Sequence, residues 1–209
     1  MITITVQAFN VFDEATEKFV TVEENTKLRM ENSLYAIAEW EKKFKKPWFP
    51  PQKASEYARK QYAEERTPEE TLYFVRCMIF EMNGKPIRYP DEVPEQLLYG
   101  LSEENFKMIR DYMGDSQTAL DHIPETKPDK KRKPDLVKFT TDRIYAWMFE
   151  TQVPMEAQYW NINRLLNVIQ VVNYDNTPDD KKKNAKPYEI AQDYAKVNEM
   201  RKQALGTKG

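Results

Sequence analysis

The side chains that could take part in catalysis are few and scattered along this chain. One cysteine, Cys77, and one histidine, His122, occur among 209 residues, so most metal sites and catalytic triads would lack their usual members. Cys77 falls within an apolar run, where a free cysteine behaves as a small hydrophobic side chain and its thiolate is disfavoured. His122 lies between Asp121 and Glu125, which form no recognisable ligand set with it, and we expect an ordinary surface histidine. The residues therefore predict a protein without enzyme activity, cofactor or metal site.

The charged clusters have structural explanations. Pairs of adjacent acidic residues recur along the chain, and most of them lie at expected helix starts, where negative charge favours the helix dipole. These pairs are Glu23-Glu24, Glu64-Glu65, Glu69-Glu70, Glu103-Glu104 and Asp179-Asp180. The four consecutive basic residues 130–133 could bind a phosphate backbone, but no aromatic residue is interleaved to stack on bases. We expect these residues to form a solvated linker.

Composition favours a folded, water-soluble protein. Apolar residues make up 40% of the chain and aromatic residues 12%, which supplies large side chains for a core. With 32 basic and 34 acidic residues the net charge is -2, so a global electrostatic attraction to nucleic acid is not expected. No apolar run approaches the roughly 20 residues that span a bilayer, and the first residues do not resemble a secretion signal. We therefore expect neither a membrane nor a nucleic acid as partner.

The elements that would position these groups are mainly helical. Residues 2–6 alternate apolar and polar side chains, and residues 19–22 repeat the β-rich composition, which predicts a hairpin that residues 27–31 could extend to three strands. Apolar spacing of three and four then predicts helices over 34–44, 54–66, 67–82 and 102–114. Thr67 and Glu70 match a capping box, and Asn83-Gly84 is expected to end the third of these helices. The predicted fold is mainly α (α+β), a helical body with a small N-terminal β-hairpin or three-stranded element.

The second half of the chain divides at a proline-bounded stretch. We assign residues 1–123 to the hairpin and helical body, 124–138 to a basic linker, 139–174 to a helical hairpin, and 175–209 to a polar tether with a terminal amphipathic helix. In the hairpin, a helix near 140–150 would be followed after Pro154 by a second helix over 155–172. The terminal helix would pack on its own body or supply a partner with an apolar stripe.

The densest group of large side chains lies between Ile144 and Tyr174. Aromatic residues and arginine are the residue types that dominate binding hot spots, because they bury much area at low entropic cost. The favoured interpretation is that the same side chains form the core of the helical hairpin, because little other core material lies on this side of the linker. A mixed role in core and interface stays open. The candidate protein-interface residues are Tyr145, Trp147, Trp160, Arg164, Tyr194 and Met200.

Two stretches of the chain resemble a family of tailed-bacteriophage and prophage morphogenesis proteins, some of which are called tail assembly chaperones. The likeness is carried by residues 31–34, 40–44, 46–49 and 67–78, and by residues 144–148, 153–154, 156, 160, 163–166 and 206–209. Members of the family tend to have a histidine after the tryptophan of the second motif, where this chain has Asn161-Ile162. The resemblance implies an assembly or structural protein that acts through protein contacts, in the host cytoplasm during assembly or in the virion.

Three hypotheses follow. The first is a tail assembly chaperone that binds tape-measure and tail-tube subunits and leaves the particle. The second is a virion structural protein at the head–tail junction or in the tail. Its partners would be head–tail connector subunits or further copies of itself in a homo-oligomer. The third is a small enzyme or host-directed effector that uses Cys77 or His122.

Overall fold

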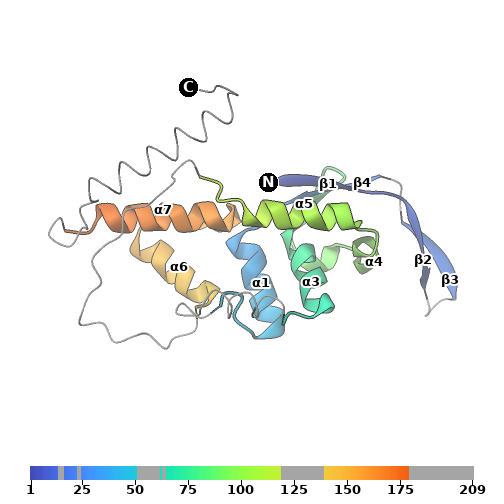
Figure 1. Cartoon of the computed structure of the whole chain (residues 1–209), viewed down its shortest axis with the longest axis horizontal. Helices are drawn as coiled ribbons and strands as arrows, with labels where there is room; N and C mark the ends of the chain where they lie inside the picture. The colour runs from blue at the N-terminus through green and yellow to red at the C-terminus, as the bar shows by residue number, and fades with distance from the viewer. Residues whose placement is uncertain (14–16, 23–24, 51–61, 63–64, 119–138, 179–209) are drawn as a thin grey trace, which may run out of the picture. The chain divides into compact units, whose positions relative to one another are not determined.

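The computed structural model describes residues 1–13, 17–22, 25–50, 62, 65–118 and 139–178 (Figure 1). The N-terminal strands are β1 (Ile2–Val6), β2 (Phe9–Asp13), β3 (Lys18–Val22) and β4 (Thr26–Met30), and helices α1 (Leu34–Phe44) and α3 (Pro68–Met78) follow. Next come β5 (Ile79–Met82), β6 (Lys85–Pro86), the 3-10 helix η1 (Pro90–Glu92), α4 (Glu95–Leu98) and α5 (Glu103–Gly114). The described chain then continues with α6 (Thr141–Glu150), the 3-10 helix η2 (Met155–Tyr159) and α7 (Ile162–Asp175). This helix-dominated α+β architecture confirms the predicted fold class.

Some predictions fall outside the described residues. They concern His122, the basic linker 124–138 and nearly all of the helix predicted over 54–66. The terminal helix, with Tyr194 and Met200, also lies outside them.

The main sheet is antiparallel and has the strand order β1-β4-β5-β6. The two strands predicted from the N-terminal pattern do not pair with each other, because β1 pairs with β4 and residues 18–22 pair with 9–13 as a separate hairpin. Alternation in β1 and β4 explains the main sheet: Ile4 and Val6 are buried on one face together with Leu28, while Thr3 and Thr5 are exposed on the other.

Local capping sets the starts of α1, α3 and α5 as predicted. The Ser33 hydroxyl accepts a hydrogen bond from the Ala36 N–H at the start of α1. Thr67 and Glu70 form the predicted capping box of α3, and Ser102 caps α5.

Helix α3 ends earlier than the sequence analysis predicted. It stops at Met78, and the next four residues form β5. Asn83-Gly84 is therefore a hairpin turn between β5 and β6, and its identification as a helix stop was wrong. Both residues have positive φ, 49° at Asn83 and 79° at Gly84, which a two-residue hairpin loop of type I′ requires.

The single helix predicted over 155–172 is also wrong. A 3-10 helix ends at Tyr159, Trp160 and Asn161 are not helical, and α7 begins at Ile162. The break has a tertiary cause, because Asn161 forms a β-bridge with Ser33 and the Ile162 N–H donates to the Asn32 carbonyl at 2.7 Å.

Two compact units divide the chain. The first comprises the described residues of Met1–Gln117 and Leu136–Leu166, so α6 and η2 belong with the N-terminal body. The second includes Thr118 and residues 167–178 of the described chain. The core of the first unit brings together fully buried side chains from the sheet and from four helices: Leu28, Met30, Leu34, Ile37, Met78, Ile144, Met148 and Leu165.

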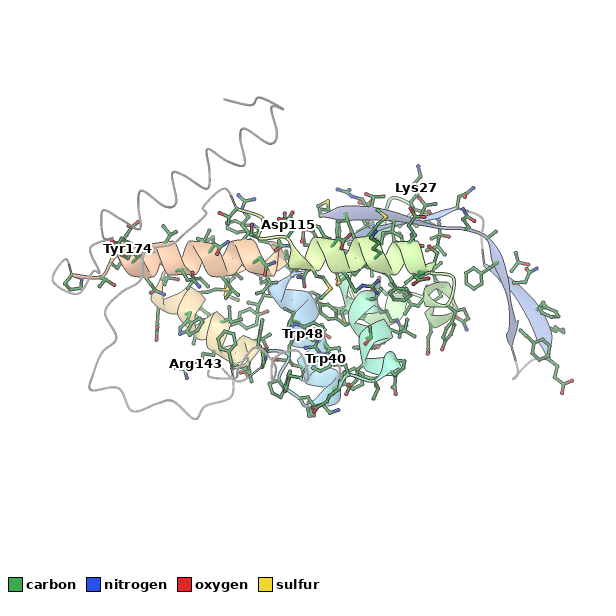
Figure 2. The ribbon with its side chains drawn as sticks, in the orientation of Figure 1. Lys27, Trp40, Trp48, Asp115, Arg143 and Tyr174 are labelled. Carbon is green, nitrogen blue, oxygen red and sulfur yellow. The ribbon has the colours of Figure 1, made fainter. Side chains whose placement is uncertain are left out.

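An aromatic cluster joins α1 to α3 in the first unit (Figure 2). The indole N–H of Trp40 donates to the Glu70 carbonyl at 2.8 Å, and the ring of Trp48 lies edge-on to Trp40 with centroids 5.0 Å apart. The Arg66 guanidinium lies 3.5 Å from the Trp48 ring centroid and donates to the Trp48 carbonyl, so it shields this cluster from water.

Candidate functional site

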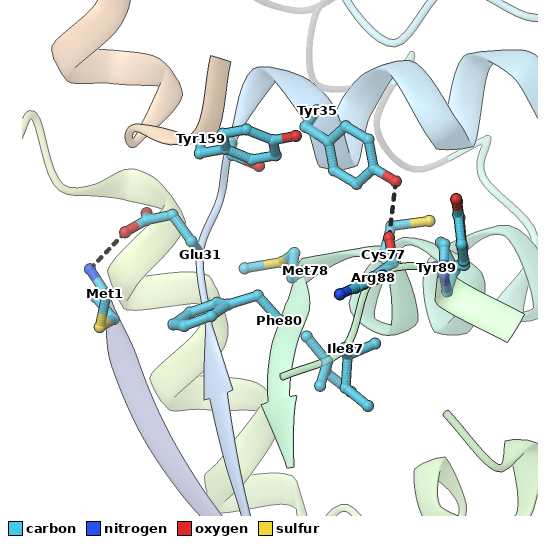
Figure 3. A pocket seen from close by; sticks show the side chains of 13 residues that line it. Met1, Glu31, Tyr35, Cys77, Met78, Phe80, Ile87, Arg88, Tyr89 and Tyr159 are labelled. Atoms are coloured by element: carbon cyan, nitrogen blue, oxygen red, sulfur yellow. Dashed lines mark hydrogen bonds and ion pairs between the residues drawn. The ribbon is translucent and has the colours of Figure 1, made fainter. Parts of the chain in front are cut away.

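A pocket of about 630 Å³ opens where the first turn of α1, the end of α3 and the connection after β6 meet (Figure 3). Its floor is largely apolar and includes Cys77, Met78 and Phe80. Three tyrosines also line it, and we call them the aromatic rim: Tyr35, Tyr89 and Tyr159. An apolar cavity with a few polar atoms at its edge is the usual form of a ligand-binding site.

The aromatic rim comes from three separate elements. Tyr35 lies in the first turn of α1, Tyr89 precedes η1, and Tyr159 ends η2. The rings of Tyr35 and Tyr159 are in contact, with centroids 5.4 Å apart. Tyr89 is 64% and Tyr159 57% exposed, so the rim offers apolar area that this unit leaves uncovered.

The hydroxyl of Tyr35 is held by the backbone on the opposite wall. It donates to the Arg88 carbonyl at 3.0 Å. Burial, with a smaller contribution from Glu39, raises the pKa of Tyr35 to about 12, so its phenol stays neutral. The pocket therefore presents the neutral hydroxyl group of Tyr35 beside apolar walls.

Cys77 lies on the pocket floor but is not activated. It is buried, and burial raises the pKa of its thiol, with Glu39 adding in the same direction. A thiol with a raised pKa is a poor nucleophile at neutral pH.

A β-bulge places Phe80 in the lining of the pocket. The register of β4 and β5 shifts between Arg29 and Met30, so Phe80 has no opposite residue. The Arg29 guanidinium lies 5.4 Å from the Phe80 ring centroid and also forms an ion pair with Glu81 at 2.8 Å. The bulge thus turns one aromatic side chain of β5 toward the solvent face of the sheet.

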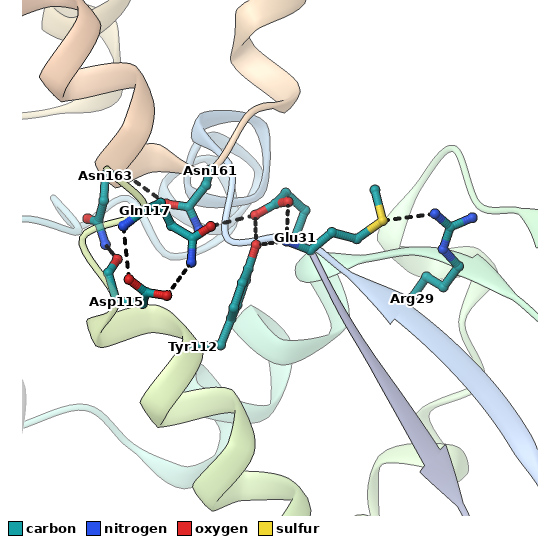
Figure 4. Close-up of polar contacts among 8 residues, drawn as sticks. Arg29, Glu31, Tyr112, Asp115, Gln117, Asn161 and Asn163 are labelled. Carbon is teal, nitrogen blue, oxygen red and sulfur yellow. Dashed lines mark hydrogen bonds and ion pairs between the residues drawn. The ribbon is translucent and has the colours of Figure 1, made fainter. Parts of the chain in front are cut away.

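Glu31, directly after β4, is the acidic group of the pocket, and it is fully engaged (Figure 4). Its carboxylate accepts hydrogen bonds from the Tyr112 hydroxyl and from the Asn161 amide at 3.2 Å, and it pairs with the amino group of Met1 at 2.9 Å. Asn163 continues the network by donating to the Met113 carbonyl at 3.1 Å. These contacts fix the start of α7 against the sheet and α5, so Glu31 acts as a structural group.

Four of the six predicted interface residues lie in the described chain, and they divide into two pairs. Tyr145 and Trp147 are half-buried on α6, and the Tyr145 hydroxyl donates to the Gln158 side chain at 3.0 Å. Trp160 is 38% exposed and Arg164 is exposed, with the guanidinium 5.3 Å from the ring centroid of the tryptophan. The first pair belongs mainly to the packing of α6, whereas the second remains available on the surface.

The aromatic rim was missed by the sequence analysis. Tyr159 stands next to Trp160 in the chain, so the local aromatic density was a signal for it. No sequence signal pointed to Tyr35 or Tyr89, because only the fold brings residues 35, 89 and 159 together.

The hairpin β2–β3 also exposes aromatic side chains. Phe12 and Phe19 face each other across the two strands with an edge-to-face contact of 5.2 Å between ring centroids. They are 50% and 72% exposed. At its base, Phe9 packs on Gly100, where even a β-carbon would come within 1.9 Å of the ring.

Among the described residues, no group of three or more histidine, cysteine, aspartate or glutamate side chains is arranged to hold a metal ion. No helix in the described part of the chain is long and apolar enough to cross a membrane.

Comparison with known proteins gave no relative: no family model, no curated protein and no solved structure matches this chain.

Proposed function

We propose that this protein is a non-enzymatic binding protein of tailed-bacteriophage morphogenesis, and that it acts as a tail assembly chaperone in the host cytoplasm. Its partners would be tape-measure and tail-tube subunits. The observation that carries the proposal is the aromatic rim, in which two largely exposed tyrosines stand at an apolar pocket.

Exposed aromatic groups around a cavity favour a protein partner. Tyrosine and arginine are enriched at binding hot spots, and a bulky apolar side chain of the partner would fill the pocket while the rim excluded water around it. The hydroxyl groups of the rim can form hydrogen bonds with a partner's backbone. Trp160 with Arg164 supplies a second surface of the same composition.

The resemblance in sequence supports the biological setting. The motif around Trp160 lies within the stretch that resembles phage morphogenesis proteins, and its exposed ring is available for binding. A chaperone needs contacts that it can release, and a contact built on one pocket and a few aromatic side chains is smaller than a permanent ring interface.

The test is co-purification of the tagged full chain with phage proteins from infected cells. We expect tape-measure or tail-tube protein to be recovered with the wild type and at least about tenfold less with Tyr159→Ala, the loss that follows from removing one hot-spot side chain. Tyr99→Ala is the matched control, because Tyr99 is 58% exposed but does not line the pocket. Equal recovery of the phage proteins with the wild type, Tyr159→Ala and Tyr99→Ala would contradict the role of the rim.

Quantitative mass spectrometry of purified particles and of the infected lysate distinguishes the chaperone from a virion component. A departing chaperone is abundant in the lysate and absent from the particle. A fixed copy number in the particle would overturn the proposal in favour of a virion structural protein.

A further inference from the structure

Strand β1 forms one edge of the main sheet. It pairs with β4 on one side, and the described part of the chain has no strand on its other side. Its residues are Ile-Thr-Ile-Thr-Val, without charge or proline. Natural edge strands are usually protected by lysine, proline or a bulge, so an unprotected edge of strong β-formers is suited to pairing with another strand.

Hydrogen bonds of β4 fix which groups of β1 face outward. The N–H and C=O of Lys27 both bond to Asn83, on the β5 side. The backbone N–H and C=O groups of successive residues point to opposite sides of a strand. Those of Leu28 therefore point toward β1, where its register partner is Ile4. The N–H and C=O groups of the neighbouring Thr3 and Thr5 therefore point to the open side of the sheet.

The sequence of β1 is complementary to itself. In an antiparallel pair centred on Ile4, Thr3 lies opposite Thr5 of the second strand, and Ile2 lies opposite Val6. Both are favourable cross-strand pairs, threonine with threonine and β-branched with β-branched. The same register brings together the outward groups of Thr3 and Thr5, which are those that an antiparallel hydrogen-bonded pair needs.

We propose that a second copy of this chain binds along β1, in an antiparallel pair centred on Ile4. Each Thr3–Thr5 pair exchanges two backbone hydrogen bonds. A two-fold axis through the Ile4 pair relates the two Thr3–Thr5 pairs to each other. The two sheets then continue into one, and both open edges are covered. The Ile4 side chains meet on the buried face, whereas the exposed threonine side chains meet on the solvent face.

The uncharged, self-complementary sequence of β1 favours a second copy over a different protein strand as the partner. Nothing in β1 offers a charge by which a different strand could be selected, whereas the two-fold register matches every side chain with its like. The inference is independent of the proposed function, since it uses the sheet edge and not the aromatic rim.

Disulfide trapping tests the register. In the proposed pair the Cα atoms of Thr3 and of Thr5 in the second copy are about 5.5 Å apart, within disulfide range. Thr3 and Thr3 of the second copy are offset by two residues and lie about 8 Å apart, beyond that range. The purified Thr3→Cys and Thr5→Cys chains are mixed under reducing conditions, so that copies exchange, and then oxidised.

We expect a covalent dimer in the mixture and none in either variant alone or in the wild type, whose Cys77 is buried. A dimer of equal yield in a single variant, or no dimer in the mixture, would overturn the register.

Charge variants test the interface without disturbing the core, because Thr3 and Thr5 are exposed. In Thr3→Glu/Thr5→Glu each glutamate faces a glutamate of the second copy, whereas within its own sheet it lies opposite Arg29 or Lys27, so the β1–β4 pair is not weakened. In Thr3→Lys/Thr5→Glu each lysine faces a glutamate of the second copy. Sedimentation should show a concentration-dependent dimer for the wild type and the Lys/Glu variant, and a monomer for the Glu/Glu variant. A wild type that stays monomeric up to about 100 µM, or equal dimerisation of all three, would overturn the proposal.

Discussion

Glu41 and Thr141 lie 100 residues apart in the chain, yet the carboxylate of Glu41 caps the helix that begins at Thr141. Its Oε2 atom accepts hydrogen bonds from the Thr141 N–H at 2.9 Å and from the Thr141 hydroxyl at 2.5 Å. Thr140, the residue at the N-cap position, makes no side-chain cap of its own. The other oxygen of Glu41 accepts from the Trp48 N–H at 2.7 Å, so one side chain on α1 holds both α6 and the segment after α1.

Replacing Glu41 by glutamine should lower the free energy of unfolding by about 1–3 kcal/mol, because an amide has one oxygen and cannot accept on both sides. Glu39→Gln, on the same helix, is the control, since Glu39 contacts Lys42 at 3.4 Å on the surface. Urea unfolding followed by tryptophan fluorescence measures both. A double-mutant cycle with Thr141→Val should give a coupling energy of about 1 kcal/mol, and additive losses would contradict the cap.

Acid should destabilise the protein partly through Glu70. The Lys46 ammonium, 2.5 Å away, lowers the pKa of this carboxyl, burial opposes that effect, and the Thr67 N–H lowers the pKa further. A carboxyl with a lowered pKa in the folded state contributes stability above its unfolded pKa of about 4.3, and that contribution is lost as the pH falls through the folded value.

The expected result is that Glu70→Gln is less stable than the wild type at pH 7 and loses less stability between pH 7 and pH 3. Glu69→Gln is the matched control, because Glu69 is exposed in the same helical turn. Parallel stability curves for wild type and Glu70→Gln across this pH range would rule out the contribution.

The starts of α1, α3 and α5 could be predicted from the sequence because their caps are neighbours in the chain, unlike the cap of α6. Ser33, Thr67 and Ser102 each cap a helix through a backbone N–H three residues later. The pairing of β1 with β4 could not be predicted in the same way, since the strand Phe9–Asp13 and its hairpin partner intervene. The break before α7 also depends on a distant residue, Ser33, which forms a bridge with Asn161.

Asn83-Gly84 shows that a correct local signal can be assigned to the wrong element. The dipeptide ends helices, but it is also a strong two-residue hairpin signal. The apolar run of α3 continues without interruption into β5, so helical periodicity extended past Met78. The deciding contact is non-local, because Asn83 bonds to Lys27 through both its backbone and its side chain.

The candidate site was predictable only in part. Trp160 and Arg164 are four residues apart, and although Trp160 precedes α7, its ring and the guanidinium are in contact. The pocket beside Tyr159 combines residues from 1 to 159, and no spacing in the sequence brings them together.

Cys77 should react with thiol reagents only when the protein opens. Burial raises its pKa, so the thiolate fraction at pH 8 is small, and the side chain is only 6% exposed. We expect modification by Ellman's reagent to be about tenfold or more slower than at the exposed Thr3→Cys position, and fast for both in 6 M guanidinium chloride. Equal rates in the native protein would show that the pocket floor is accessible.

A side chain at Gly100 should destabilise the protein. Any β-carbon there would meet the ring of Phe9, a residue of the β2–β3 hairpin, with 1.9 Å to the nearest atom. Gly100→Ala should therefore cost about 1–3 kcal/mol in stability. Gly114→Ala is the matched control, because nothing lies within 4 Å of a β-carbon at that position. Combining Gly100→Ala with Phe9→Leu should restore part of the loss, since a smaller side chain makes room; a double variant that loses the sum of both effects would show that Phe9 is not what excludes the β-carbon.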